Sequence, residues 1–143
     1  MTVKEFVCTA AGVIGAAVSS VFGGWNAALT TLVIFMIIDY ITGTMVAAVW
    51  KRSAKSENGG LSSASGLRGL CRKATVLASV LVAARLDLIT GSAYIRDAAC
   101  IGFILNETLS IIENAGLMGV PLPGVIRDAV DVLGKAKDKG ENK

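Results

Sequence analysis

Four apolar stretches, each close to the length of a membrane-spanning helix, occupy most of this sequence. They cover residues 6–22, 27–50, 74–92 and 97–117. Crossing the hydrocarbon core of a bilayer takes about 20 residues of α-helix, so each stretch is a candidate span. Charged residues make up 17% of the chain, below the roughly 25% of soluble globular proteins. The sequence therefore predicts an all-α integral membrane protein with three or four transmembrane helices.

The stretches differ in how readily each would enter a membrane alone. The 27–50 stretch contains ten Leu, Ile, Val and Phe residues. Together these are worth roughly −3 to −6 kcal/mol, against about +2.5 to +3.5 kcal/mol for a central Asp39. The 97–117 stretch contains eight such residues and carries Glu107 near its middle. Its apolar and charged contributions roughly cancel, so this helix needs partners in order to span.

The 6–22 stretch allows three interpretations. It is a spanning helix, a helix lying in the membrane interface, or a signal peptide, because Lys4 precedes an apolar run that ends in small residues. Only GGWN separates this run from the next apolar stretch, which favours a helix that is retained.

Residues 51–73 form a predicted loop that carries six basic residues and one glutamate. Short basic loops stay on the cytoplasmic side of a membrane. We therefore expect the turns at 23–26 and 93–96 to be external and both termini to be cytoplasmic. Residues 1–120 would form the membrane domain.

The remaining segment, 121–143, is predicted to be cytoplasmic. Pro121 and Pro123 end the fourth stretch, since proline cannot donate a helix hydrogen bond. Apolar residues then recur at helical spacing over 125–136, opposite charged residues, which predicts a short amphipathic helix on the membrane surface. The final KAKDKGENK is predicted to be disordered.

Three ionisable residues are expected at one depth in the bilayer. Asp39 precedes Trp50 by eleven residues, and Arg85 follows the start of its stretch by eleven, which places both about 16 Å from the cytoplasmic boundary. Glu107 falls at a similar depth. Charges inside membranes pair or line wet cavities, so we hypothesise an Asp39–Arg85 pair with Glu107 close by. Asp87, like Asp39, begins an Asp-x-Ile-Thr-Gly segment, although so short a match also arises by chance.

Polar residues of the last stretch share one side of a helical wheel. At 100° per residue they lie within about a third of the circumference. This stripe is formed by Arg96, Asn106, Glu107, Ser110, Glu113 and Asn114. A polar stripe on a spanning helix indicates either buried interhelical hydrogen bonds or a water-filled lumen, and the sequence leaves both open.

Small residues recur every fourth position on the first stretch and its end, in two adjacent rows. Such rows let helix backbones approach closely in a membrane. They include Gly12, Gly15, Ala16, Ser19, Ser20 and Gly23, and we add Gly43 of the second stretch as a further helix-packing position. The rows predict either contacts between protomers or packing within one chain.

Several function classes lack support in the residues. The chain has no histidine, and its three cysteines are widely and irregularly spaced, so neither a disulfide framework nor a metal site is indicated. There is no nucleophile–base set and no phosphate-binding glycine motif. The basic loop lacks the aromatic residues typical of nucleic-acid binding. We expect no enzyme activity, no cofactor and no nucleic-acid partner.

Three segments carry a resemblance to a known family. They are DYITG at 39–43, LSSASGLRGLCRK at 61–73 and NETLSIIENAGLMGVPLPGVI at 106–126. In these segments the chain resembles the toxin-secretion/phage-lysis holins. The matching positions are Asp39, Gly43, Ser62, Gly66, Gly69, Lys73, Glu107, Ser110, Glu113, Asn114, Pro121 and Pro123.

The resemblance implies a function that composition alone does not indicate. Holins gather in the cytoplasmic membrane of the host, assemble as homo-oligomers and open lesions through which an endolysin or toxin leaves, so that the cell lyses. The partners implied are the lipid bilayer, further copies of the chain and such a cargo. Two alternatives remain: a small ion or proton channel or transporter that uses Asp39, Arg85 and Glu107, and an antagonist holin that regulates the timing of lysis.

Overall fold

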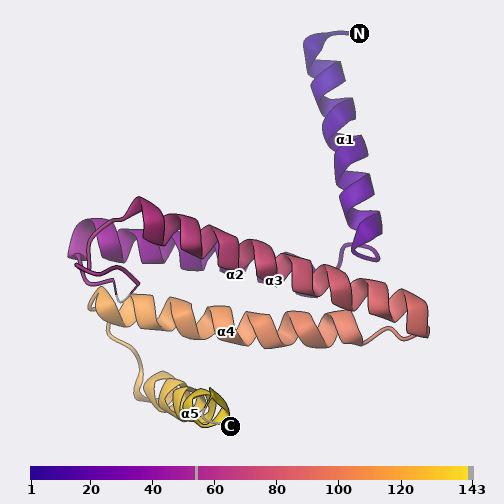
Figure 1. Ribbon diagram of the computed structural model, residues 1–143. Helices are drawn as coiled ribbons and strands as arrows, with labels where there is room; N and C mark the ends of the chain where they lie inside the picture. Colours follow the sequence, from indigo (N-terminus) through magenta and orange to yellow (C-terminus); the bar gives the residue numbers. More distant parts are fainter. Residues whose placement is uncertain (54, 142–143) are drawn as a thin grey trace. The chain divides into compact units, whose positions relative to one another are not determined.

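The computed structural model describes residues 1–53 and 55–141, and this part of the chain is helical throughout apart from short connections. The five α-helices are labelled in Figure 1, and a single π-helical turn, η1, continues α2. In chain order these elements are α1 (Val3–Val21), α2 (Ala27–Met45), η1 (Val46–Trp50), α3 (Ser63–Thr90), α4 (Ile95–Leu117) and α5 (Gly124–Glu141). The all-α prediction is confirmed for the described residues.

The chain forms two compact units, and α2, α3 and α4 each contribute to both. Unit 1 comprises Met1–Ile34 and Leu70–Ile104, and unit 2 comprises Phe35–Gly69 and Leu105–Lys143. Unit 1 has an apolar core. The buried residues of that core are Leu29 and Leu32 of α2, Val80, Ala83 and Ala84 of α3, and Cys100 of α4.

Unit 2 has a mixed core. Met36, Val46 and Ala47 supply its buried apolar side chains. Its other buried residues are polar, since every buried polar or charged residue of the described chain, namely Asp39, Glu107 and Asn114, belongs to this unit. Buried polar groups are costly unless they are hydrogen-bonded. The buried polar side chains of unit 2 therefore need specific hydrogen-bond partners.

Local signals account for both ends of α1. Thr2 caps its start, because the Thr2 hydroxyl accepts from the Glu5 amide (3.2 Å) and the Glu5 carboxylate accepts from the Thr2 amide (2.7 Å). Gly23 ends it in the left-handed region, at φ +76°. The amides of Gly23 and Gly24 then donate to the carbonyls of Ser20 and Ser19, which is the Schellman arrangement. Gly23 therefore terminates the helix, and its role in helix packing stays a prediction.

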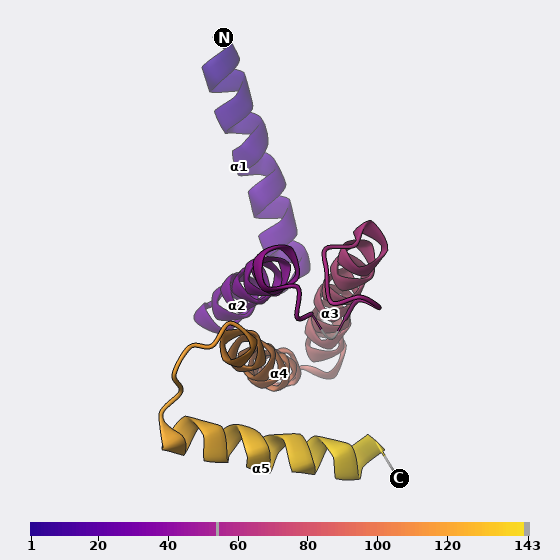
Figure 2. The same cartoon turned by 90° about the vertical axis from the view of Figure 1, so that its left-hand side faces the viewer.

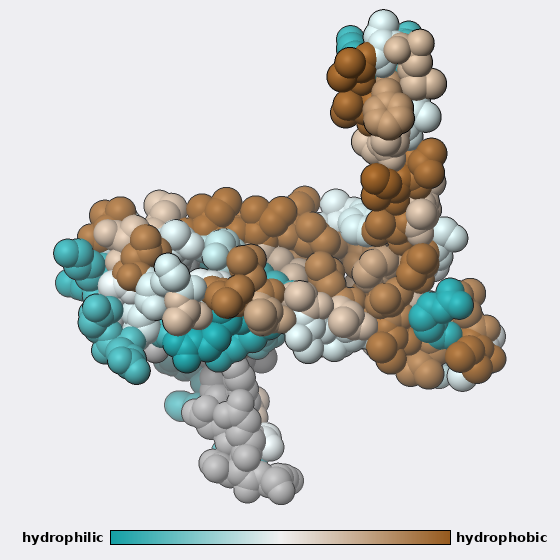
Figure 3. All heavy atoms as spheres, turned by 45° about the horizontal axis from the view of Figure 1, so that its top comes forward, coloured by the Kyte–Doolittle hydropathy of each residue, from teal (hydrophilic) through white to brown (hydrophobic). Residues whose placement is uncertain are grey.

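Two described helices are long and apolar enough to cross a membrane. They are α1 and the continuous helix formed by α2 and η1, Ala27–Trp50. None of the side chains of α1 is buried, and in Figure 3 apolar brown spheres run along this helix. Of the three or four predicted spans, the structure therefore supplies two candidates by length and composition.

The third helix begins earlier than the sequence indicated. We expected a loop over 51–73 followed by a helix at 74–92, whereas α3 already begins at Ser63. Ser62 caps it, because its hydroxyl accepts from the Ser65 amide at 3.4 Å. The Ser, Gly and charged residues of 63–73 that looked like a loop form the first turns of this helix.

The C-terminal helix is also longer than expected. Figure 2 shows the connector of residues 118–123, which leads from α4 into α5. Within the predicted disordered tail, residues 135–141 belong to α5. The last two residues of that prediction, 142 and 143, lie outside the described part of the chain.

The loop between η1 and α3 is held by its own hydrogen bonds. The Ser53 amide donates to the Gly59 carbonyl (3.0 Å), and the Ser56 hydroxyl donates to the Gly60 carbonyl (2.8 Å). Lys51 enters the loop at φ +52°. Hydrophilic teal spheres gather at this loop in Figure 3.

Gly59→Ala is expected to destabilise this loop. Gly59 has φ +73°, and a Cβ there would lie 2.3 Å from the Lys51 carbonyl oxygen, so the backbone must shift, at a cost of about 1–3 kcal/mol. Faster proteolysis between Trp50 and Ser63 in detergent-solubilised protein would report this. Gly102→Ala is the matched control, since nothing lies within 4 Å of its Cβ position. Equal cleavage of the two variants would contradict the prediction.

Candidate functional site

The buried polar cluster of unit 2 joins α2 to α4 through one amide. The Asn114 Nδ2 donates to Asp39 Oδ1 (3.1 Å), to the Asp39 backbone carbonyl (3.3 Å) and to Thr42 Oγ1 (2.9 Å). Asp39 and Asn114 are only 5% and 6% exposed. An amide nitrogen has two hydrogens, so two of the three acceptors share one hydrogen, and the contact fixes the rotation of both helices.

Two residues of α2 next to Asp39, Thr42 and Gly43, contribute to this contact. The Thr42 hydroxyl donates to the carbonyls of Ile38 (2.8 Å) and Asp39 (3.1 Å), which leaves its lone pairs free to accept from Asn114. A Cβ at Gly43 would lie 3.6 Å from Asn114 Nδ2. Gly43, predicted as a helix-packing position, therefore lies beside the amide of α4 within the same chain.

Glu107 lies on the same side of α4 as Asn114. The two residues are seven apart, which is about 20° on a helical wheel, and Glu107 is 5% exposed. Every buried side-chain nitrogen or oxygen in the described chain has a hydrogen-bond partner. The side of α4 that carries these two residues therefore forms part of a satisfied polar core.

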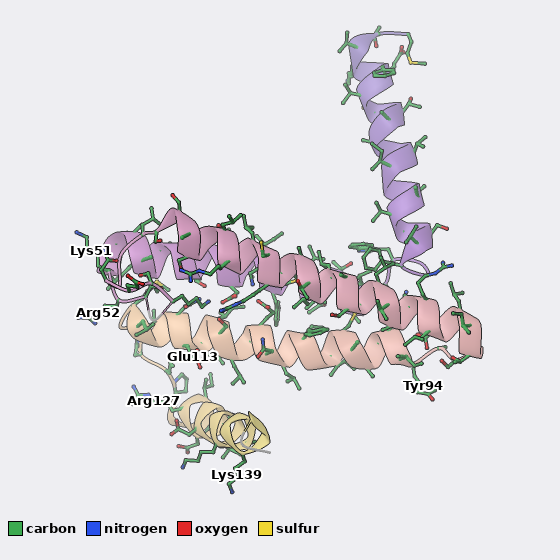
Figure 4. The ribbon with its side chains drawn as sticks, viewed as in Figure 1. Lys51, Arg52, Tyr94, Glu113, Arg127 and Lys139 are labelled. Carbon is green, nitrogen blue, oxygen red and sulfur yellow. The ribbon has the colours of Figure 1, made fainter. Side chains whose placement is uncertain are left out.

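The outer half of the predicted stripe, Asn106 and Glu113, lies about 100° around the helix from Glu107 and Asn114. Asn106 and Glu113 are exposed, and Ser110 is half-buried. Figure 4 shows the Glu113 side chain projecting from α4 away from α2. The stripe is thus divided: Glu107 and Asn114 are buried in the protomer, while Asn106 and Glu113 remain on its surface.

Arg85 lies in unit 1, where its side chain is exposed. Its predicted pairing with Asp39 joins residues of different units and stays a prediction.

One contact of unit 2 had no counterpart in the sequence reasoning. The Tyr40 ring lies against two glycines at the start of α3, since a Cβ at Gly66 would lie 3.3 Å from the Tyr40 hydroxyl oxygen and one at Gly69 would lie 3.6 Å from its Cε2. The signal was the spacing of three between these glycines, which puts both on one face of a helix. These two family-matching glycines leave room for an aromatic side chain.

A second polar cluster belongs to unit 1 and is centred on Arg96. Its Nη1 donates to the carbonyls of Phe22 (2.8 Å), Gly23 (3.2 Å) and Gly24 (2.7 Å). Carbonyls at the end of a helix lack intrahelical partners, so the guanidinium at the start of α4 satisfies the turn that follows α1. The Arg96 side chain is 14% exposed. We name this contact the Arg96 clamp.

Two further residues extend the Arg96 clamp to the start of α2. Asp97 Oδ1 accepts from Arg96 Nε (3.3 Å) and from Asn26 Nδ2 (2.9 Å). Asn26 in turn caps α2, because its Oδ1 accepts from the Leu29 amide at 3.0 Å. The sequence placed Arg96 on the polar stripe of its helix, but its partners are the α1–α2 turn.

Asp87 fixes the adjoining turn between α3 and α4. Its Oδ1 accepts from the Ser92 hydroxyl (2.6 Å) and the Ile95 amide (3.0 Å), and its Oδ2 accepts from the Arg96 amide (2.9 Å). Asp87 thus caps α4 from the preceding helix. Asp39 accepts instead from the side-chain amide of Asn114, so the two Asp-x-Ile-Thr-Gly segments have different structural roles.

Among the residues that the structure describes, none covers the small-residue rows on α1 at Gly12 and Gly15. Nothing lies within 4 Å of a Cβ built at Gly12 or Gly15. Ala16 and Ser20 are exposed and Ser19 is partly covered. These positions are available for contacts that a single chain does not make.

Comparison with known proteins places this arrangement in a family. The model of the "Bacteriophage holin family" matches residues 16–135, which include both polar clusters. The chain belongs to the bacteriophage holin family. This confirms the resemblance drawn from the 39–43, 61–73 and 106–126 segments.

Similar proteins occur in bacteria and in a phage. An uncharacterised protein of Clostridium perfringens is 35% identical over 131 residues, covering 89% of this chain and 91% of its own. An uncharacterised protein of Halalkalibacterium halodurans is 36% identical over 129 residues, covering 86% and 90%. A protein of Bacillus phage phi105 named "Probable holin" is 34% identical over 116 residues, covering 80% of each chain. No solved structure matches the chain.

Proposed function

We propose that this holin-family protein oligomerises in the bacterial cytoplasmic membrane and opens lesions through which an endolysin or a toxin leaves the cytoplasm. The observation that carries the proposal is the family match over 16–135, supported by the similarity to the phage protein named as a holin. The two apolar helices, α1 and Ala27–Trp50, support a membrane location. The mechanism requires no catalytic residue.

The proposed topology has three or four spanning helices and cytoplasmic termini. In it α3 and α4 also cross the bilayer, although each carries charges. Support comes from exposed aromatic residues at the turns of unit 1, where Trp25 is 47% and Tyr94 is 71% exposed. Such residues gather at membrane–water interfaces. The basic loop after Trp50 would lie at the opposite, cytoplasmic interface.

The proposed assembly uses surfaces that the single chain leaves open. The uncovered face of α1 at Gly12 and Gly15 would contact a further copy, since small residues permit close helix approach. The exposed Asn106 and Glu113 would turn towards water once enough copies surround a lesion, because a polar surface facing lipid is costly. Glu107 and Asn114, being buried, would hold the protomer together.

Expression in bacteria tests the proposal. Induction together with a cytoplasmic muralytic enzyme is expected to cause an abrupt loss of membrane potential followed by lysis, whereas the enzyme alone leaves the cells intact. Loss of potential without lysis would favour the channel or transporter alternative, because ions would pass and a folded enzyme would not. If this chain delays the lysis that a second, co-expressed holin causes, the antagonist alternative is favoured.

A further inference from the structure

The C-terminal helix α5 presents an apolar face that no described part of the chain covers. Every described side chain between Gly124 and Gly140 is exposed. Val125 is 81% and Val132 is 66% exposed. At 100° per residue, Val125, Ala129 and Val132 fall within about 60° of one another, so they form one apolar face of the helix.

Two lysines and one aspartate border this face on one side. From Val132, Lys139 lies at about 20°, Asp128 at about 40° and Lys135 at about 60° around the helix, so this edge carries a net positive charge. Arg127 and Asp131 lie on the opposite side of the helix. Lysines at the border of an apolar face can bury their methylene stems while their ammonium groups reach outward. This arrangement suits a surface that is apolar below and anionic at its edge.

The same unit holds a second group of basic residues close to the start of the connector. Lys51, Arg52 and Lys55 are exposed in the loop after η1. Figure 4 shows Lys51 and Arg52 at the end of unit 2 where α4 ends, with Arg127 on α5. The connector of residues 118–123 can extend about 20 Å at most, so α5 stays close to the level at which α4 leaves the membrane.

From these observations we infer that α5 docks on the anionic surface of the cytoplasmic leaflet, with Val125, Ala129 and Val132 among the acyl chains and Lys135 and Lys139 at the phospholipid headgroups. The inference rests on the proposed function only in requiring that the chain be in a membrane. An apolar face this small binds weakly alone. Each basic residue near an anionic surface adds about fivefold to the binding constant, so docking depends on the anionic lipid content.

A spin-label experiment on the full chain tests the docking. Cys8, Cys71 and Cys100 are first replaced, and a nitroxide is attached to a cysteine introduced by Val132→Cys or, as the matched control, by Asp131→Cys. In phosphatidylglycerol-containing vesicles, the Val132→Cys label is expected to collide with dissolved oxygen more than with a water-soluble nickel reagent. In pure phosphatidylcholine it moves towards water, whereas the Asp131→Cys label stays in water in both.

Charge variants measure how much the basic residues contribute to docking. Lys135→Gln with Lys139→Gln is expected to lower the docking equilibrium constant about 25-fold, while Arg127→Gln on the opposite face leaves it nearly unchanged.

Two results would overturn the inference. One is a Val132→Cys label that stays in water in both lipids. The other is a label protected equally in both lipids whose protection grows with protein concentration, since a second copy would then cover the face. Lipid-dependent immersion in vesicles that release no cargo would support the docking while contradicting the proposed lesion.

Discussion

Replacing Arg96 with methionine is expected to be among the most damaging single changes to this protein. The guanidinium donates to three carbonyls of the α1–α2 turn and to Asp97. Hydrogen bonds to charged groups contribute about 1.5–3 kcal/mol each, and water can replace part of them at a turn. We expect a loss of about 2–4 kcal/mol in the free energy of unfolding, measured by dodecyl sulfate titration in mixed micelles.

Two control variants, a conservative one at Arg96 and one at an exposed arginine elsewhere, separate the loss of the Arg96 hydrogen bonds from a general loss of charge. Arg96→Lys keeps the charge but loses the planar fork, so an intermediate loss is expected. Arg68→Met removes an exposed arginine of α3 and is expected to change the free energy of unfolding by less than about 0.5 kcal/mol. If Arg96→Met is as stable as Arg68→Met, the Arg96 clamp does not hold the turn.

The clamp also predicts a functional effect. Because α1 has no buried side chain, the Arg96 clamp, which joins the α1–α2 turn to the start of α4, is expected to hold this turn within unit 1. Arg96→Met is therefore expected to expose the 22–26 turn to protease and to delay lysis at equal expression. Lysis at the normal time, with a protease-sensitive turn, would show that assembly does not need an anchored α1.

Asn114→Ala is the second change with a large expected effect. It removes the amide that donates to Asp39 and Thr42 and leaves buried acceptors of unit 2 without that donor. An unsatisfied buried group costs about 1–3 kcal/mol, and we expect a loss of this size in the same titration. Asn114→Asp is expected to cost more, because it places a second carboxylate beside that of Asp39.

Glu113 supplies the matched control for Asn114. It precedes Asn114 directly but is exposed, so Glu113→Ala is expected to change the free energy of unfolding by less than about 0.5 kcal/mol. The proposed lesion places Glu113 near water, so this variant is expected to alter lesion formation without altering folding. Equal destabilisation by Asn114→Ala and Glu113→Ala would contradict the division of the stripe into a buried and an exposed half.

Much of the fold could be predicted because apolar runs and helix terminators are local signals. The 27–50 stretch corresponds to α2 with η1, and the 97–117 stretch to α4, within two residues at each end. The start of α3 was missed because Ser, Gly and charged residues resemble a loop in sequence. These residues form a helix here because Ser62 caps its start and the Tyr40 ring packs against Gly66 and Gly69.

The candidate sites could be predicted only in part, for a similar reason. Helical angles place Glu107 near Asn114 on α4, but the sequence does not say which edge of a polar stripe meets a neighbouring helix. That depends on Asp39 and Thr42 of α2. The partners of Arg96 are backbone carbonyls, which carry no residue-type signal. Periodicity could therefore place Arg96 on the stripe of α4 but could not indicate that its guanidinium contacts the α1–α2 turn.

Release of two cargoes of different size from liposomes tests the central claim most directly. Purified protein is reconstituted at increasing protein-to-lipid ratio into vesicles that contain a small dye and a folded, labelled enzyme. Assembly of many copies into one lesion predicts that both cargoes leave together and steeply above a threshold ratio. Release of the dye with full retention of the enzyme at every ratio, or release of neither, would contradict the account.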